Sequence, residues 1–217
     1  MQRGRFITFE GGEGSGKSTQ ARRLAARLEA EGIAVTLTRE PGGSPFAEHL
    51  RSVILDPTTP PHAPLSEALL FYAARADHVA HTIRPALAAG RWVVCDRFSD
   101  STRVYQGTAG ALSSETIEAL EAIAVAPTVP DLTLVVDIDP EIGLARADLR
   151  RDRVEGGPRD RYEARTLAYH AALRQGFLAI AAQDPARCVV IDGAGGEEAV
   201  AGQVWAAAER RLMARTG

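Results

Sequence analysis

The stretch GGEGSGKSTQ, residues 11–20, holds the only lysine in a chain of 217 residues. Lysine and arginine together number 25, so apart from Lys17 all of these residues are arginines. From Gly11 to Ser18 the spacing is G-x-x-x-x-G-K-S, which lets backbone N–H groups turn toward a phosphate. A compact ammonium fits between the β- and γ-phosphates of a nucleotide, where the wide fork of arginine would crowd the loop. The stretch therefore predicts a phosphate-binding loop.

Strands and helices alternate on both sides of this loop. Short runs rich in Val, Ile, Leu, Phe and Thr predict strands buried on both faces of a parallel sheet, at 5–10, 33–38, 91–96, 132–139 and 187–192. Helices are expected near 18–31, 45–55, 65–89, 98–106, 113–125, 140–150, 159–183 and 197–214. Asp139 and Pro140 supply an N-cap and a first helical residue for the helix at 140. The alternation is typical of a doubly wound α/β sheet, and we expect a single domain over residues 1–217.

Composition narrows the class of protein. Hydrophobic residues make up 45% and charged residues 24% of the chain. The sequence contains no run of 18 apolar residues, the length that a membrane-spanning helix needs. We expect a cytoplasmic protein without a signal peptide or a membrane partner. The formal net charge of -3 argues against a nucleic-acid partner. Cys95 and Cys188 interrupt or end apolar runs and are expected to be small buried hydrophobes.

Charged side chains follow two of the predicted strands. Arg39 and Glu40 follow the second strand, and Asp96 and Arg97 end or follow the third. Ligands of an open parallel sheet gather outside the carboxyl ends of its strands. Either arginine alone could form a surface salt bridge, but two at one edge favour an anion site.

The predicted helix 65–89 places an aromatic ring beside an arginine. Phe71 and Arg75 are four residues apart and share a helix face, where they could cradle a flat base. The alternative is that Phe71 belongs to the core and Arg75 to the surface. His78 and His81 also share a face, but no third metal ligand accompanies them.

Five segments, TFEGGEGSGKST, TREPGG, FYAAR, DRFSDSTRVYQG and PDLTLVVDI, together resemble the bacterial thymidylate kinase family in order and spacing. The resemblance spans nearly the whole chain. It implies a P-loop NTPase fold, an α/β fold with a five-stranded parallel sheet flanked by helices on both faces. It also implies ATP-dependent phosphorylation of dTMP to dTDP, with Mg²⁺, by a homodimer.

The resemblance implies a role for particular residues. ATP binding falls to Gly11, Gly12, Glu13, Gly14, Ser15, Gly16, Lys17, Ser18 and Thr19. Binding of dTMP falls to Glu13, Arg39, Arg51, Phe71, Arg75, Arg97, Thr102, Tyr105 and Gln106. The resemblance assigns binding of Mg²⁺ to Ser18 and Asp96. It assigns catalysis to Lys17 and Arg97, together with arginines of a lid.

Three of these residues follow the third strand on a predicted helix. Thr102 and Gln106 are expected to complete a polar edge for thymine, and Tyr105 to crowd the position of a ribose 2′-hydroxyl. The alternative is that Tyr105 serves packing and Gln106 caps the helix.

The lid is expected near residues 150–158. Some relatives carry a catalytic arginine inside the phosphate loop, and this loop has none. The sequence RRDRVEGG begins at residue 150, where the family places a lid that supplies the arginine instead. Arg153 is the first candidate and Arg151 the second; composition alone favours a solvated surface turn.

Three other activities compete with this interpretation. Another small-molecule kinase could use the same fold. A GTP-dependent switch needs an Asn-Lys-x-Asp guanine reader, which a chain without asparagine cannot contain. A P-loop ATPase that drives a partner protein is a third alternative. The sequence gives it no support, because it shows neither a long linker nor an obvious partner surface.

Overall fold

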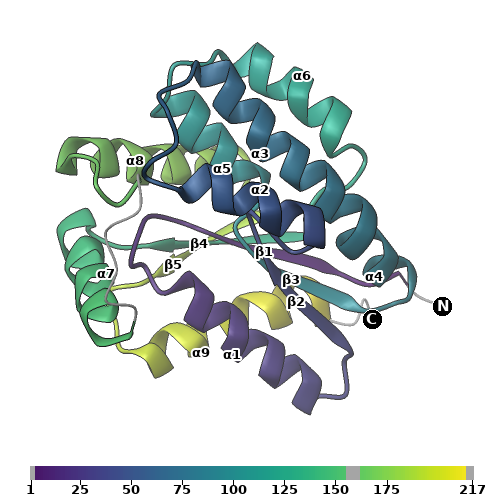
Figure 1. Ribbon diagram of the computed structural model, residues 1–217. Helices are drawn as coiled ribbons and strands as arrows, with labels where there is room; N and C mark the ends of the chain where they lie inside the picture. Colours follow the sequence, from purple (N-terminus) through teal and green to yellow (C-terminus); the bar gives the residue numbers. More distant parts are fainter. Residues whose placement is uncertain (1–2, 155–161, 214–217) are drawn as a thin grey trace.

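The computed structural model of the chain describes residues 3–154 and 162–213, with the backbone alone for 153–154. Five parallel strands form one sheet in the order β2-β3-β1-β4-β5, which confirms the predicted fold class (Figure 1). The strands are β1 (Phe6–Glu10), β2 (Val35–Arg39), β3 (Trp92–Asp96), β4 (Leu132–Asp137) and β5 (Cys188–Asp192). The helices are α1 (Lys17–Ala30), α2 (Pro45–Leu55), α3 (Pro64–His78), α4 (Arg84–Ala88), α5 (Ser99–Thr102), α6 (Ser114–Ala124), α7 (Pro140–Val154), α8 (Leu167–Gln183) and α9 (Glu197–Ala208). π-helical turns are η1 (Val79–Ile83), η2 (Arg103–Thr108) and η3 (Glu209–Met213).

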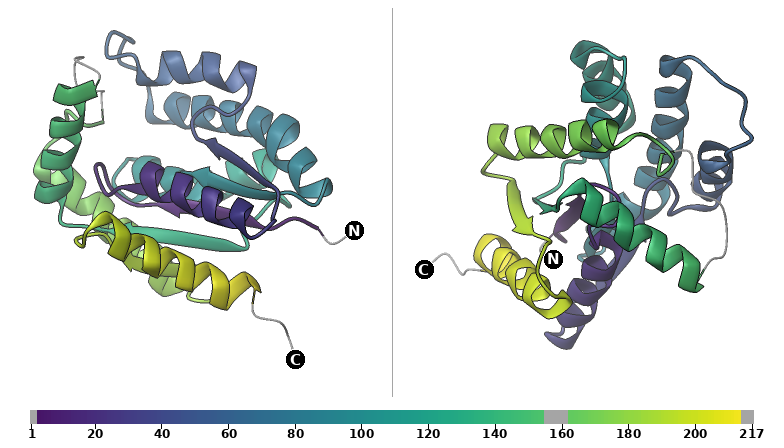
Figure 2. Two further views of the ribbon diagram at one scale, coloured as in Figure 1. Left: turned by 90° about the horizontal axis from the view of Figure 1, so that it is seen from below. Right: turned by 90° about the vertical axis from the view of Figure 1, so that its left-hand side faces the viewer.

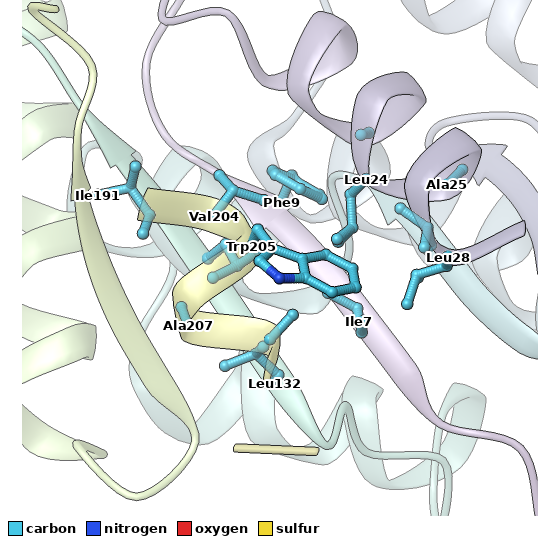
Figure 3. Packing of buried hydrophobic residues seen from close by; sticks show 14 of the residues in the cluster. Ile7, Phe9, Leu24, Ala25, Leu28, Leu132, Ile191, Val204, Trp205 and Ala207 are labelled. Atoms are coloured by element: carbon cyan, nitrogen blue, oxygen red, sulfur yellow. The ribbon is translucent and has the colours of Figure 1, made fainter. Parts of the chain in front are cut away.

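Helices cover both faces of the sheet. On one face, α1 and α9 pack against the strands through residues such as Leu28 and Trp205 (Figures 2 and 3). On the other face, α3, α4 and α6 cover β1 and β3, while η2 and α8 cover β4 and β5. Strands buried on both faces account for the nearly continuous apolar runs of the sequence. Both cysteines are buried in these cores, as predicted.

The strand order places β1 between β3 and β4. Arg39 at the end of β2 is in register with Asp96 at the end of β3, and Phe9 of β1 is also in register with Asp96. The carboxyl ends of these three strands therefore meet at one edge of the sheet, where the phosphate loop leaves β1.

Two predicted helices contain a π-helical turn. The helix expected at 65–89 is continuous but divided into α3, η1 and α4. Pro85 explains this division, because it has no N–H to donate to the carbonyl of His81 four residues earlier. The helix expected at 98–106 consists of α5 and η2 and runs to Thr108.

Two helix boundaries differ from the sequence prediction. The helix expected at 140–150 continues to Val154, and the one expected at 159–183 begins, within the described residues, only at Leu167. Thr166 causes the later start, because its extended backbone cannot continue a helix and its side chain accepts a hydrogen bond from the N–H of Tyr169. Asp139 caps α7 through the N–H of Glu141, as predicted.

Candidate active site

The phosphate loop joins β1 directly to α1. Gly16, with φ 95°, is the N-cap residue, and no side chain caps the helix. The first N–H groups of α1 are thus left to an anion, which the positive end of the helix dipole also attracts. Gly14 must be glycine for two reasons. Its φ is +63°, and a Cβ there would lie 1.8 Å from the carbonyl oxygen of Gly143.

Lys17 lies at the start of α1 with 6% of its surface exposed. Its Nζ donates to the carbonyl oxygen of Gly12 at 2.5 Å and to Oγ of Ser15 at 3.2 Å. Burial, with the positive charge of Arg97 beside it, lowers the pKa of Lys17 to about 8. These two hydrogen bonds hold the ammonium inside the loop, where a bound phosphate would contact it.

Arg97 faces the loop from the end of β3. Its Nη2 donates to Oε1 of Glu13 at 2.7 Å, and the hydroxyl of Tyr105 donates to the same oxygen at 2.6 Å. Burial opposes the charge of Glu13, but Arg97 and Lys17 outweigh it and lower the pKa of Glu13 to about 2. Arg97 is the one described residue other than glycine with a positive φ, 68°. Strained backbone of this kind clusters at functional sites.

Ser18 and Asp96 lie together beneath the loop. The hydroxyl of Ser18 donates to Oδ2 of Asp96 in a short hydrogen bond. Oδ1 of Asp96 is buried and has no hydrogen-bond partner among the described residues. A hydroxyl and a carboxylate with a free oxygen suit Mg²⁺, which is usually held by one or two protein ligands together with substrate phosphates. The described residues contain no group of three His, Cys, Asp or Glu that could hold a metal ion by themselves.

The loop after β2 carries further positive charge. Arg39 is more than half exposed, and its Nη2 lies 3.1 Å from Oε2 of Glu48. Arg51 of α2 donates from Nη1 to the carbonyl oxygen of Pro41 at 2.7 Å. Burial, with the neighbouring charge of Arg39, lowers the pKa of Arg51. Glu48 supplies negative charge beside both arginines, and a bound anion would stabilise them further.

Helix α3 contributes a ring and a buried arginine. The ring of Phe71 is half-buried, with its centroid 6.2 Å from that of Tyr162. Arg75 is buried, and its Nη1 donates to Oγ1 of Thr102 at 2.9 Å. The alternative of a core Phe71 and a surface Arg75 is therefore wrong for Arg75, while the cradle for a base stays a prediction. Gln106 does not cap its helix; its Nε2 donates to Glu67 at 2.8 Å.

One cleft of about 640 Å³ joins these groups. Its lining includes most of the predicted site residues: Glu13, Gly14, Gly16, Lys17, Ser18, Thr19, Arg39, Arg51, Phe71, Arg75, Asp96, Arg97, Thr102, Tyr105 and Gln106. A nucleotide and a second small molecule could share a hollow of this size.

Known proteins resemble this chain over almost its whole length. The family model described as thymidylate kinase matches residues 9–204. The chain belongs to the thymidylate kinase family. A thymidylate kinase of Bradyrhizobium sp. strain BTAi1 is 50% identical over 211 residues, 97% of this chain and 92% of that protein. One of Nitrobacter winogradskyi is 52% identical over 212 residues, 98% of this chain and 91% of that protein.

Solved structures agree with this assignment. A crystal structure of thymidylate kinase from Ehrlichia chaffeensis is 32% identical, covers 94% of this chain and 98% of its own, and superposes with a TM-score of 0.75. The predicted family, and with it the class of nucleoside monophosphate kinase, is thus confirmed. No helix within the described ranges is long and apolar enough to span a membrane.

Five predicted site residues of this thymidylate kinase family member lie outside the large cleft or beyond description. Gly11, Gly12 and Ser15 do not line it. Gly12 and Ser15 instead accept the hydrogen bonds of Lys17 that hold the loop closed. The side chain of Arg153 lies outside the described residues, as do the lid residues 155–158.

Arg151 does not line the cleft itself. It forms ion pairs with Asp148 and with Glu163, the latter at 3.1 Å. Its neighbour Arg150 does line the cleft and lies 3.7 Å from Glu163. The first residues of the predicted lid, 150–154, are helical and form the C-terminal end of α7.

The cleft also contains residues that we did not predict from the sequence. They come from α1, from β2 and the loop after it, from α2 and α5, and from the turn before α8: Ala21, Arg22, Leu37, Thr38, Pro41, Leu55, Ser101, Tyr162 and Glu163. Thr38 and Pro41 lie inside the quoted motif TREPGG, and Ser101 lies inside DRFSDSTRVYQG, so all three could have been included on that ground. Tyr162 and Glu163 carry no local signal, because they reach the cleft only through the packing of α7 and α8.

Proposed function

We propose that the protein transfers the γ-phosphoryl group of ATP to dTMP and releases dTDP and ADP. The observation that carries this proposal is the shared cleft, which is lined both by Lys17 of the phosphate loop and by Phe71 and Arg75 of α3. Membership in the thymidylate kinase family supports it. The proposal includes a cytoplasmic location, where both substrates occur, and a homodimer.

The donor side of the cleft binds ATP. Its phosphates lie on the loop N–H groups and the start of α1, and Lys17 contacts the β- and γ-phosphates. Ser18 and Asp96 hold Mg²⁺, whose chemistry is to bridge phosphate oxygens and neutralise charge on them. The pairing of Glu13 with Arg97 keeps both side chains ionised beside the transferring group.

The acceptor side binds dTMP. Arg39, Arg51 and Arg97 supply positive charge for its phosphate, and Phe71 offers a face on which thymine stacks. Arg75 keeps N–H groups that can donate to a thymine carbonyl, since three of its five donate to Glu40, Thr102 and Phe98.

Three residues after β3 complete the acceptor side. Thr102 and Gln106 add polar groups at the edge of the base, and Tyr105 crowds the position of a 2′-hydroxyl. Its hydroxyl is already fixed by Glu13, so the ring cannot turn aside easily.

Catalysis depends on positive charge around the transferring group. Phosphoryl transfer needs little covalent help, so positioning and electrostatic stabilisation carry most of it. Lys17 and Arg97 supply two charges from the floor of the cleft, and we assign a third to the lid, first to Arg153 and then to Arg151. The place of Arg150 on the cleft wall supports a role for this end of α7.

Acceptor-dependent release of ADP tests this function. We expect turnover with ATP and dTMP, and little with ATP alone. The ratio kcat/KM should favour dTMP over dUMP by about tenfold or more, because one methyl group in an apolar pocket contributes roughly 1–3 kcal/mol. CMP and GMP should be rejected more strongly, because they would leave buried donors or acceptors unpaired. Release of ADP without an acceptor would indicate a switch or motor, and equal use of CMP or GMP another kinase.

A further inference from the structure

A buried charged cluster lies behind the acceptor wall of the cleft. It consists of Glu40, Arg75 and His78, whose side chains are 3%, 2% and 0% exposed. Glu40 follows β2, whereas Arg75 and His78 lie one turn apart on α3. Glu40 and Arg75 line the cleft, but His78 does not. Any influence of the imidazole on a substrate must therefore pass through its neighbours.

Hydrogen bonds determine which tautomer of His78 is present. Nδ1 lies 2.9 Å from Oε1 of Glu40, whose other oxygen accepts from Nε of Arg75 at 2.6 Å. A carboxylate in an ion pair with arginine only accepts hydrogen bonds, so Nδ1 carries the proton. In the neutral ring Nε2, 2.8 Å from Oγ1 of Thr38, accepts from that hydroxyl. The ring thus bridges Thr38 and Glu40.

The same ring supports the loop that follows β2. Gly43 has φ +86°, and a Cβ there would lie 2.3 Å from Nε2 of His78 and 2.5 Å from Oγ1 of Thr38. The loop therefore rests directly on the imidazole, with no room for a side chain between them. Thr82 holds it from the other side, by donating to the carbonyl oxygen of Gly43 at 2.6 Å. Arg39 extends from this supported segment.

We propose that His78 is a positioning residue of the acceptor site. Through Glu40 it fixes the guanidinium of Arg75 at the edge of the base, and through Thr38 and Gly43 it fixes the loop that presents Arg39 to the phosphate. This inference rests on the proposed function, which places dTMP against both arginines. One buried imidazole would then set base selectivity and phosphate affinity together, by two separate hydrogen bonds.

Two substitutions separate the two hydrogen bonds. In His78→Asn the amide lies near the position of Nδ1 and can still donate to Glu40, but nothing reaches Thr38. In His78→Gln the longer amide reaches the position of Nε2 and Thr38, but Glu40 loses its second donor. A buried carboxylate oxygen without a donor weakens the geometry of its remaining partner.

Steady-state kinetics with dTMP and CMP test the proposal. His78→Gln should raise KM for dTMP roughly tenfold and lower the preference for dTMP over CMP, while kcat at saturating dTMP and KM for ATP stay within about threefold. His78→Asn should raise KM for both acceptors and keep the preference. His81→Gln is the matched control, because His81 is exposed on η1 and outside the cleft.

Several results would overturn the proposal. One is an unchanged KM for dTMP in both His78→Asn and His78→Gln when both fold. Another is an equal loss of the preference for dTMP over CMP in the two variants. A third is a loss of ATP binding and of kcat as large as the loss of dTMP binding. If the variants fail to fold, Thr38→Val removes the hydroxyl that the ring accepts from; a raised KM for dTMP would support the proposal and an unchanged KM would overturn it. A wild-type protein that shows no dTMP-dependent turnover would instead contradict the proposed function.

Discussion

Lys17 and Glu10 are ionisable residues at either end of the same short connection, and burial shifts their pKa values in opposite directions. Burial lowers the preference of Lys17 for the charged form, and the negative charge of a bound phosphate would restore it. Glu10 ends β1 with no exposed surface, and its carboxylate accepts from the N–H of Phe98 at 2.7 Å and from Ser101 at 2.6 Å. Burial first, and then the nearby charge of Asp100, raise its pKa.

Lys17 is expected to be chemically distinctive. With its pKa lowered to about 8, the fraction of free amine rises steeply around that pH, so an amine-reactive reagent should label Lys17 faster as pH rises. Saturating ATP should shield it, while the N-terminal amine serves as the internal control. Lys17→Ala should lower kcat at least about 100-fold in a protein that still folds. Labelling that ATP does not change would contradict the assignment.

Glu10 is expected to make stability depend on pH. Its pKa is higher in the folded chain than the ordinary 4.5, so as pH rises the unfolded chain releases this proton first and the free energy of unfolding falls. Glu10→Gln cannot titrate. Urea unfolding between about pH 5 and pH 8 should therefore show the wild type losing stability relative to Glu10→Gln. Glu118→Gln, an exposed carboxylate on α6, is the control; parallel curves for wild type and Glu10→Gln would disprove the effect.

At the scale of secondary-structure elements, the ends of helices supply more of the active site than their centres do. The start of α1 is open for phosphate, and the C-terminal end of α7 brings Arg150 to the cleft wall. Glu163 connects this end of α7 to the turn before α8, because it pairs with both Arg150 and Arg151. Thr166 then starts α8. These contacts hold the first part of the predicted lid against the body of the protein.

The end of α7 can be tested one arginine at a time. Arg153→Ala should lower kcat by roughly a thousandfold and leave KM for dTMP nearly unchanged, because such an arginine acts mainly in the transition state. Arg151→Ala should lower kcat less than Arg153→Ala does, since the side chain of Arg151 already pairs with Asp148 and Glu163. Single-turnover rates of the variants, with Arg150→Ala beside them, give the ranking. An unchanged rate for Arg153→Ala would return that residue to an ordinary surface role.

At the scale of the whole molecule, the sheet brings distant segments to one edge and leaves apolar side chains outside. Phe46 and Val53 of α2, with Leu65 and Leu69 of α3, are more than a third exposed. The two helices pack against each other. Apolar surface of this kind is often buried between subunits.

The predicted homodimer can be measured directly. Light scattering should give a mass near twice the 23.1 kDa of one chain. Leu69→Arg should shift the mass toward the monomer, because a charge cannot be buried unpaired between subunits. Ile142→Arg, a similar change on α7, should leave the mass unchanged. A monomer in the wild type at assay concentration would refute the homodimer.

The sequence alone predicted those features of the fold that depend on interactions between residues a few positions apart. The spacing from Gly11 to Ser18 depends on backbone turns within a few residues, so it predicted the loop and its lysine. The caps at Asp139 and Pro140 likewise predicted the start of α7. The later start of α8 was missed, because the cap at Thr166 was not recognised within a long helical pattern. The single domain, the individual site residues and the lid arginines remain predictions.

What the sequence by itself determined is therefore the alternation of strands and helices, the glycine-rich connection from β1 to α1, and the family. Only the tertiary structure decided which strands are neighbours, and with that the meeting of Arg39 with Asp96. It also decided that His78 bridges Thr38 and Glu40, and that Tyr162 reaches the cleft. The physical reason is range: helices, turns and caps depend on residues a few positions apart, whereas strand order and buried polar clusters depend on packing summed over the whole chain.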